Sequence, residues 1–281
     1  MTIEEVRQRN TYYESIIEKV NKNKMSSITE NVDRIGNFTS SEIAALMTTS
    51  KDGKSFGKPA LTYIEEKNME RRLGRSLDSE TNARPLTWGK LIEKRVFDLL
   101  GLEYTLTSQE TVQHPTISCW SGSQDGNKFD DGGTVIDIKC PITLKSFCQL
   151  VDGIYQCEDS LGVADGNMII HSVCETHKDG EKYYWQLVSN AILTNSKYAE
   201  LIVYVPYKSE LPEIRELANN YDGNDQHKYA WIVYADDNEL PYLPDDGYYK
   251  NLNIIRFLVP ESDKILLTEK VLAAQKLLIN A

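Results

Sequence analysis

The chain has 281 residues, of which 41% are hydrophobic, and its formal net charge is −11. That length and composition suffice for one large core, whereas the acidic balance argues against a protein that coats DNA generally. The charge does not exclude a nuclease, because a metal site uses acids as ligands and one basic groove can coexist with an acidic exterior.

The apolar runs are too short to span a membrane, and the N-terminal segment MTIEEVRQRN lacks an apolar signal core. We therefore expect a cytoplasmic protein with no membrane segment. Its five cysteines form no Cys-x-x-Cys pair, which favours reduced thiols over a disulfide framework or a zinc site.

The N-terminal part of the chain reads as helices separated by a loop. We predict a helix over 4–24 and another from near Thr39, where the hydroxyls of Thr39, Ser40 and Ser41 can cap the first turn. The stretch KDGKSFGK at 51–58 is typical of a loop. Further helices are predicted over 59–73 and over 86–100. The second of these has an apolar stripe of Leu91, Ile92, Val96, Leu99 and Leu100.

Strands and helices alternate in the remainder. Short β-type runs are predicted at 103–107, 110–113, 116–121 and 133–139. They are followed by a helix over 143–151, a strand over 166–175, a helix over 182–195 and a strand over 199–205. The last part contains a predicted helix at 211–219, strands near 228–235 and 253–259, and a closing helix from about 261. The pattern predicts an α/β protein with a central sheet, and no linker-like stretch requires a second domain.

The segment from Ser121 to Pro141 carries the candidate chemistry. Asp137 and Lys139 lie two apart in the strand IDIK, so they share one face, while Ile136 and Ile138 face the other way. A short hairpin would bring Asp125 beside Asp137. Two carboxylates and an amine suit phosphodiester hydrolysis, because carboxylate oxygens hold Mg²⁺. On its own, however, Asp-x-Lys is usually a solvated strand edge, and Asp-Gly is an ordinary hairpin signal.

Four sequence blocks in order give this segment a context. They are DRIGNFTSSEIAALM (33–47), TWGKLIEKRVFDLL (87–100), SGSQDG with IDIKCP (121–126 and 136–141), and YYWQLVSNAILTNSKYAELIVYVP (183–206). Together they resemble the YqaJ-like viral recombinase, or phage lambda exonuclease, family of the PD-(D/E)XK nuclease superfamily. Two departures stand out: Asp137 where the family often has glutamate, and Gln124 where it usually has proline.

The resemblance implies a role for each matching residue. Asp125 and Asp137 would be metal ligands, Glu93 would bind or orient the metal through water, and Lys139 would be the catalytic lysine. Gln186 would help to arrange the site. Arg34 and Ser41 would hold the 5′-terminal phosphate of the degraded strand. Independently of the resemblance, Lys51, Lys54 and Lys58 of the 51–58 loop could contact the DNA backbone.

The resemblance also implies a fold and a function. We expect a restriction-endonuclease-like α/β fold, with a mixed central sheet flanked by helices, in one domain over 1–281 that has a core of about 33–206 and a C-terminal extension at 207–281. The expected activity is Mg²⁺-dependent (alternatively Mn²⁺-dependent) 5′→3′ exonuclease action on double-stranded DNA ends, leaving 3′ overhangs for phage-type recombination. Expected partners are a single-strand annealing protein and further copies in a trimer, in a bacterial cell that harbours a phage or mobile element. A structure-specific PD-(D/E)XK endonuclease and a non-catalytic DNA-end-binding module are the alternatives.

Overall fold

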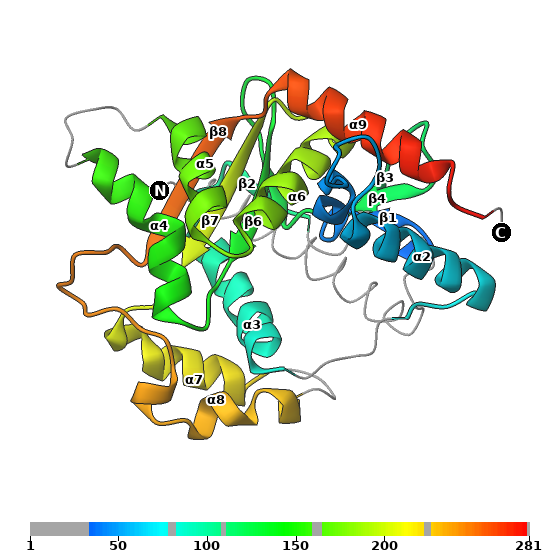
Figure 1. Ribbon diagram of the computed structural model, residues 1–281. Helices are drawn as coiled ribbons and strands as arrows, with labels where there is room; N and C mark the ends of the chain where they lie inside the picture. The colour runs from blue at the N-terminus through cyan, green and yellow to red at the C-terminus, as the bar shows by residue number, and fades with distance from the viewer. Residues whose placement is uncertain (1–33, 78–82, 108–110, 159–164, 222–225, 280–281) are drawn as a thin grey trace, which may run out of the picture.

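The computed structural model describes residues 34–77, 83–107, 111–158, 165–221 and 226–279 (Figure 1). The strands of its main sheet are Tyr104–Leu106 (β2), Gly126–Lys128 (β5), Thr134–Lys139 (β6), Tyr198–Tyr204 (β7) and Leu252–Leu258 (β8). They are arranged in the order β2-β5-β6-β7-β8. β6 and β7 run parallel, whereas every other neighbouring pair is antiparallel. The sheet is therefore mixed, as predicted.

Helices cover both faces of this sheet (Figure 1). One face packs against Leu144–Glu158 (α4), Gly166–Thr176 (α5), Gly180–Leu193 (α6) and Glu261–Gln275 (α9). The other face packs against Arg84–Leu99 (α3), Leu211–Asn219 (α7) and Ala230–Tyr234 (α8). Because side chains alternate along a strand, Val135 joins the first core, while Ile136 and Ile138 join the second.

A second, smaller sheet ties the N-terminal part of the described chain to this body. Its strands are Phe38–Thr39 (β1), Trp120–Gly122 (β4) and Val112–Gln113 (β3), in the order β1-β4-β3. The short helix Ile43–Met47 (η2) and the helix Lys58–Leu73 (α2) follow β1. The hydroxyl of Ser189 in α6 accepts a hydrogen bond from Trp120 Nε1 (2.9 Å) and lies 2.7 Å from Ser40 Oγ.

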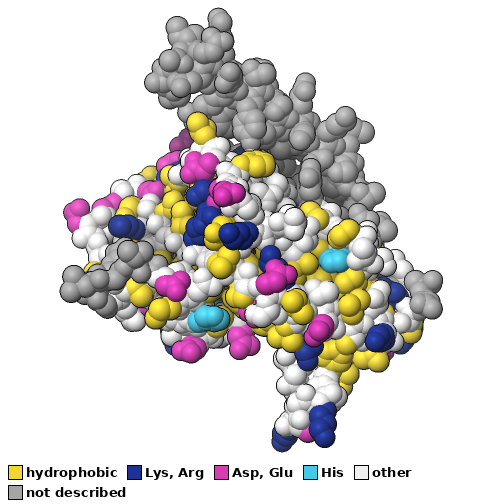
Figure 2. Space-filling view, turned by 90° about the horizontal axis from the view of Figure 1, so that it is seen from above, with side chains coloured by type: hydrophobic (Ala, Val, Ile, Leu, Met, Phe, Trp, Pro, Cys, Tyr) yellow, Lys and Arg dark blue, Asp and Glu magenta, His cyan; other side chains and the backbone are white. Residues whose placement is uncertain are grey.

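Short helical turns connect the elements of the C-terminal part: Lys208–Glu210 (η3), Gln226–Lys228 (η4) and Asp237–Glu239 (η5). β8 extends the main sheet at its edge, and Lys264 Nζ of α9 donates to Ser196 O (3.0 Å), just before β7 begins. The face along which α9 lies carries acidic, basic and apolar side chains in mixture (Figure 2). None of the described helices is long and apolar enough to cross a membrane.

Three predicted elements are wrong. Thr39 belongs to strand β1, and the helix that follows is a 3-10 turn beginning at Ile43 without a side-chain cap. Residues 166–175 form α5 rather than a strand, because Asp165 caps the helix through Asn167 N–H and its apolar residues bury one face. Residues 228–235 contain η4 and α8 instead of a strand. The helix predicted over 4–24 lies outside the described residues.

Candidate active site

The β5–β6 hairpin brings two predicted carboxylates together. Gly126 pairs with Ile136, so Asp125 and Asp137 stand opposite each other one position further along. Asp125 Oδ2 accepts a hydrogen bond of 2.6 Å from the backbone N–H of Ile138. The predicted hairpin that brings Asp125 beside Asp137 is therefore confirmed. Its turn lies at 130–133 and not at Asp125-Gly126, because Gly126 is the first residue of β5.

Gly126 is required by close approach of the neighbouring backbone. A Cβ atom at this position would lie 2.5 Å from Thr105 O and 3.0 Å from both Ile136 Cδ1 and Phe97 Cζ. Any side chain here would push β5 away from β2 and β6. The glycine after Asp125 thus keeps the strand that presents this carboxylate in the sheet.

Asp137 is the centre of the polar contacts. Its carboxylate is 1% exposed, and Gln186 Nε2 in α6 donates to Oδ1 at 2.7 Å. Lys139 Nζ lies 2.8 Å from Oδ2 on the same strand face. The structure therefore brings Asp137, Lys139 and Gln186 into one cluster, in agreement with the side-chain alternation predicted for IDIK.

Burial and mutual repulsion together shape the electrostatics of this cluster. Burial raises the pKa of Asp125 well above its ordinary value, and the charges of Asp137 and Glu93 raise it further. Burial also raises the pKa of Glu93, with Asp137 adding to the rise. Burial alone would lower the pKa of Lys139, but Asp137 and Asp125 outweigh it and raise that pKa. Lys139 is therefore an ammonium at neutral pH, held among carboxylates that repel one another.

The donor set fits a hard divalent cation. Asp125, Asp137 and Glu93 can offer only oxygen ligands, which Mg²⁺ prefers. A cation beside them would offset both the burial and the mutual repulsion that raise the pKa of Asp125 and Glu93. Asp137 Oδ2 is buried and accepts no conventional hydrogen bond in the part of the chain that the structure describes, although Lys139 stands beside it. Across the described ranges, no three acidic, His or Cys side chains already converge in a metal-binding arrangement.

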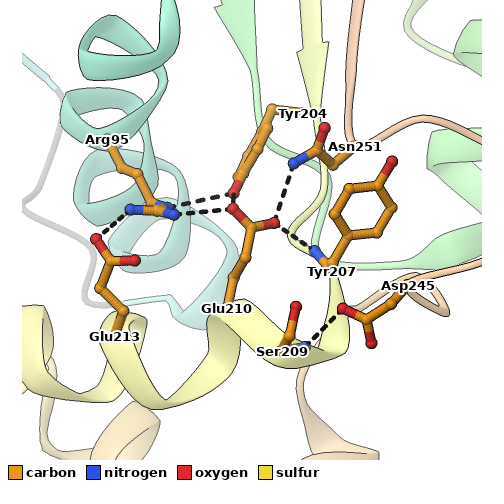
Figure 3. Close-up of polar contacts among 8 residues, drawn as sticks. All are labelled: Arg95, Tyr204, Tyr207, Ser209, Glu210, Glu213, Asp245 and Asn251. Carbon is orange, nitrogen blue, oxygen red and sulfur yellow. Dashed lines mark hydrogen bonds and ion pairs between the residues drawn. The ribbon is translucent and has the colours of Figure 1, made fainter.

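A partly buried ion-pair network fixes the helix that carries Glu93 (Figure 3). Arg95 of α3 donates to Glu210 Oε1 (2.8 Å) and Tyr204 Oη (3.3 Å), and it also pairs with Glu213. Glu210 Oε2 accepts from the backbone N–H of Tyr207 (2.6 Å) and from Asn251 Nδ2 (3.0 Å). α3 is thereby joined to β7 and to the turn before α7, which holds it against the carboxyl end of the sheet.

Arg95→Met is expected to destabilise the fold by roughly 2–3 kcal/mol, because Glu210 would stay buried without its guanidinium. Glu210 is only 15% exposed, whereas Glu213 is 57% exposed. Glu213→Gln is therefore the matched control and should cost no more than about 1 kcal/mol. Urea denaturation of the two variants checks this, and equal losses would refute the importance of the Arg95–Glu210 pair.

Of the two predicted phosphate-binding residues, Ser41 lies in a segment that contacts α6, the helix that carries Gln186. Ser41 Oγ lies 3.3 Å from Thr39 Oγ1, and the next residue, Glu42, pairs with Lys182 of α6 at 2.7 Å. The Ser41 segment thus lies against the first turns of the helix that supplies Gln186. Arg34 lies four residues before β1, and its carbonyl accepts from Asn37 N–H at 3.2 Å.

The three predicted DNA-contacting lysines are exposed and belong to a different part of the fold. Lys51 and Lys54 lie in the turn between η2 and α2, and Lys58 is the first residue of α2. Ser50 and Asp52 brace this turn, with Ser50 Oγ donating to Asp52 Oδ1 at 2.5 Å. The predicted loop is confirmed over 51–57, whereas Lys58 already belongs to α2. This loop is not part of the sheet that holds the carboxylates.

Two site features were not predicted from the sequence. One is the backbone N–H of Ile138, which holds Asp125. The other is Tyr183, whose ring lies 4.9 Å from Lys139 Nζ. Only the second had a signal in the sequence: Tyr183 precedes Gln186 by three residues, which places both on one face of a helix.

The fold is shared with exonucleases of alkaline and phage-related type, in line with the resemblance of the sequence blocks. LHK-Exo, an alkaline exonuclease from Laribacter hongkongensis solved in complex with dAMP, has 16% identity and a TM-score of 0.50, covering 87% of this chain and 89% of its own. A phage-related exonuclease from Haemophilus somnus has 13% identity and a TM-score of 0.53, with 86% and 92% covered.

At such identities the likeness shows the fold, and the predicted restriction-endonuclease-like α/β class is confirmed. No protein-family model matches the sequence, and no curated protein matches it significantly.

Proposed function

We propose that the protein is a metal-dependent DNA exonuclease. The observation that carries the proposal is the meeting of Asp125, Asp137 and Lys139 at the carboxyl end of β6, with Gln186 bonded to Asp137. This arrangement lies in a fold shared with two exonucleases. Carboxylates beside a lysine are suited to phosphodiester hydrolysis, whereas an ordinary strand edge would leave them in solvent.

Each residue has a proposed role in this chemistry. Asp125 and Asp137, assisted by Glu93, would hold Mg²⁺ or Mn²⁺, which when bound supplies positive charge beside the phosphate and makes water more acidic. Lys139, being an ammonium, would orient the attacking water or stabilise negative charge on the phosphate by donating hydrogen bonds. Gln186 would fix the orientation of Asp137, because its amide occupies Oδ1.

Digestion of a linear duplex labelled at either end of one strand tests the activity, its metal requirement and its polarity together. With Mg²⁺ we expect the 5′ label to be released at once as a mononucleotide and the 3′-labelled strand to shorten progressively. EDTA should stop both reactions. A 3′ label released first would reverse the proposed polarity, and hydrolysis in EDTA would refute the metal requirement.

Arg34→Ala is expected to abolish a preference for 5′-phosphorylated ends, raising KM for such ends about tenfold or more, because a guanidinium donates charge-assisted bonds to phosphate. KM for 5′-hydroxyl ends should change little. Lys54→Ala is the matched control, because loss of a contact to the DNA backbone would weaken the binding of 5′-phosphate and 5′-hydroxyl ends equally. If Arg34→Ala raised KM equally for both kinds of end, Arg34 would not be the residue that binds the 5′-phosphate.

The wider setting is proposed from the sequence resemblance. We propose that the enzyme acts as a homotrimer on double-stranded ends and hands the 3′ overhang to a single-strand annealing protein, in the cytoplasm of a bacterium that harbours a phage or mobile element. Light scattering of the purified protein measures its oligomeric state. A monomeric mass at working concentration would contradict the trimer without affecting the proposed chemistry.

A further inference from the structure

We propose that Tyr183 is a positioning residue that holds the ammonium of Lys139 through the face of its ring, an inference that rests on the proposed nuclease function. The ring centroid lies 4.9 Å from Lys139 Nζ. At this distance a cation is attracted by the negative face of an aromatic ring. The contact is made by the face of the ring.

One helix holds both partners of the central ion pair. Tyr183 and Gln186 lie three residues apart in α6, so they project from the same side of the helix. Gln186 reaches Asp137 Oδ1 at 2.7 Å, while Tyr183 covers the ammonium that pairs with Asp137 Oδ2 at 2.8 Å. α6 thus restrains the acid by a hydrogen bond and the lysine by a ring face.

The ring of Tyr183 is itself supported from behind. His177, which is 4% exposed, stacks on it with centroids 5.5 Å apart and planes inclined by 29°. His177 Nδ1 accepts the backbone N–H of Asp179 at 3.1 Å, which leaves Nε2 to donate to Ser146 Oγ at 2.7 Å. Both ring nitrogens are engaged, so the histidine cannot turn without losing a bond. The aromatic pair therefore forms a rigid backing for the lysine.

The aromatic pair of Tyr183 and His177 restrains a side chain that is otherwise flexible. Lysine has a flexible four-carbon stem, and holding its ammonium in one place costs side-chain entropy. Asp137 attracts Lys139, but Asp125 is close enough to attract it as well, so charge alone leaves two competing positions. The ring face restricts the ammonium to the side that adjoins Asp137.

Kinetics of Tyr183→Leu and Tyr183→Phe test the inference. Tyr183→Leu should lower kcat roughly 5- to 30-fold, the range to which a partly desolvated cation–π contact corresponds, with KM for DNA ends nearly unchanged. Tyr183→Phe keeps the ring face and should stay within about twofold of the wild type. Tyr198→Leu is the control, because it removes contacts of the same kind (Lys197 Nζ at 5.2 Å and Arg256 Cζ at 4.3 Å from the ring centroid) at the opposite end of β7; its kcat should not change.

An activity-independent readout separates this inference from the proposed function. In protein labelled with ¹³C at lysine Cε, the ring should shift the Lys139 ε-methylene signal upfield, and the signal is assigned by its loss in Lys139→Arg. The shift should persist in Tyr183→Phe and disappear in Tyr183→Leu.

A wild-type protein that shows the shift but no hydrolysis would refute the nuclease and leave the contact standing. Absence of the shift, a Tyr183→Leu variant as active as the wild type, or a Tyr183→Phe variant as impaired as Tyr183→Leu would overturn the positioning role.

Discussion

Lys139→Met is expected to lower the rate of DNA hydrolysis by roughly 10²–10³-fold, the usual effect of removing one donor that stabilises charge developing in a transition state. Methionine preserves the length of the side chain and its apolar stem but places no cation beside Asp137 Oδ2, which Lys139 approaches to 2.8 Å. Single-turnover digestion with enzyme in excess measures this rate without a contribution from product release.

The loss must be separated from a loss of folding. Asp137 is 1% exposed, so removal of Lys139 leaves a buried carboxylate without its cation and should also reduce stability. Lys139→Arg retains the charge and should retain stability, but it cannot place one compact ammonium at the same point and should remain strongly impaired. Hydrolysis by a folded Lys139→Met variant at the wild-type rate would exclude Lys139 from the chemistry.

Asp125→Asn is expected to abolish hydrolysis while raising the melting temperature of the metal-free protein at neutral pH. The asparagine Oδ1 can still accept from Ile138 N–H, a bond of 2.6 Å in the wild type, but it carries no charge to be repelled by Asp137 and Glu93. A gain of about 1 kcal/mol would raise Tm by roughly 2–4 °C in a chain of this size. Differential scanning calorimetry measures it.

The rise in Tm expected for Asp125→Asn follows from the pKa of Asp125, which is raised well above its ordinary value of 3.8 in the folded protein. An acid with a raised folded pKa contributes stability below its unfolded pKa and loses that contribution as pH rises through the folded pKa. The wild type should therefore lose stability over this range, from about pH 4 upward, and Asp125→Asn should lose less. Equal pH profiles for the two proteins would contradict the electrostatic account.

Asp137→Asn is the matched control for this prediction, because it should have the opposite effect. Its amide would face the Lys139 ammonium, which lies 2.8 Å from Asp137 Oδ2, and the buried ion pair would be lost. We expect a lower Tm together with loss of hydrolysis. Added Mg²⁺ should raise Tm in the wild type and much less in either variant. A higher Tm for Asp137→Asn would contradict the ion pair.

The hairpin that forms the site was predictable because its signals are local. The turn of the hairpin lies at 130–133, where Gly132 and Gly133 have positive φ. The alternation in IDIK assigns Asp137 and Lys139 to one face and Ile136 to the other, as the two cores confirm. The shorter Asp137 side chain, a departure from the family pattern, still reaches both Gln186 and Lys139. The contact with Lys139 depends on side-chain alternation over three residues, which the sequence specifies. The contact with Gln186 spans 49 positions and depends on where α6 lies on the sheet.

Two of the three wrongly predicted elements, those at 166–175 and 228–235, are short apolar stretches without a clear periodicity. NMIIHSVC is compatible with a buried strand or a buried helix, and the choice depends on tertiary contacts: Ile169, Ile170 and Val173 face the core from α5. Local pattern also cannot show that His177 stacks on Tyr183, or that Tyr183 approaches Lys139 across 44 positions of sequence. Such contacts follow only once the helices are placed on the sheet.

The most direct test of the central claim compares a linear plasmid with the same plasmid as a covalently closed circle, each incubated with the wild-type protein and Mg²⁺. An exonuclease that needs a DNA end should reduce the linear form to acid-soluble nucleotides and leave the circle intact, and Lys139→Met should degrade the linear form roughly 10²–10³-fold more slowly. Cleavage of the closed circle by the wild type would instead identify a structure-specific endonuclease. Binding of linear ends without any hydrolysis would identify a non-catalytic end-binding module.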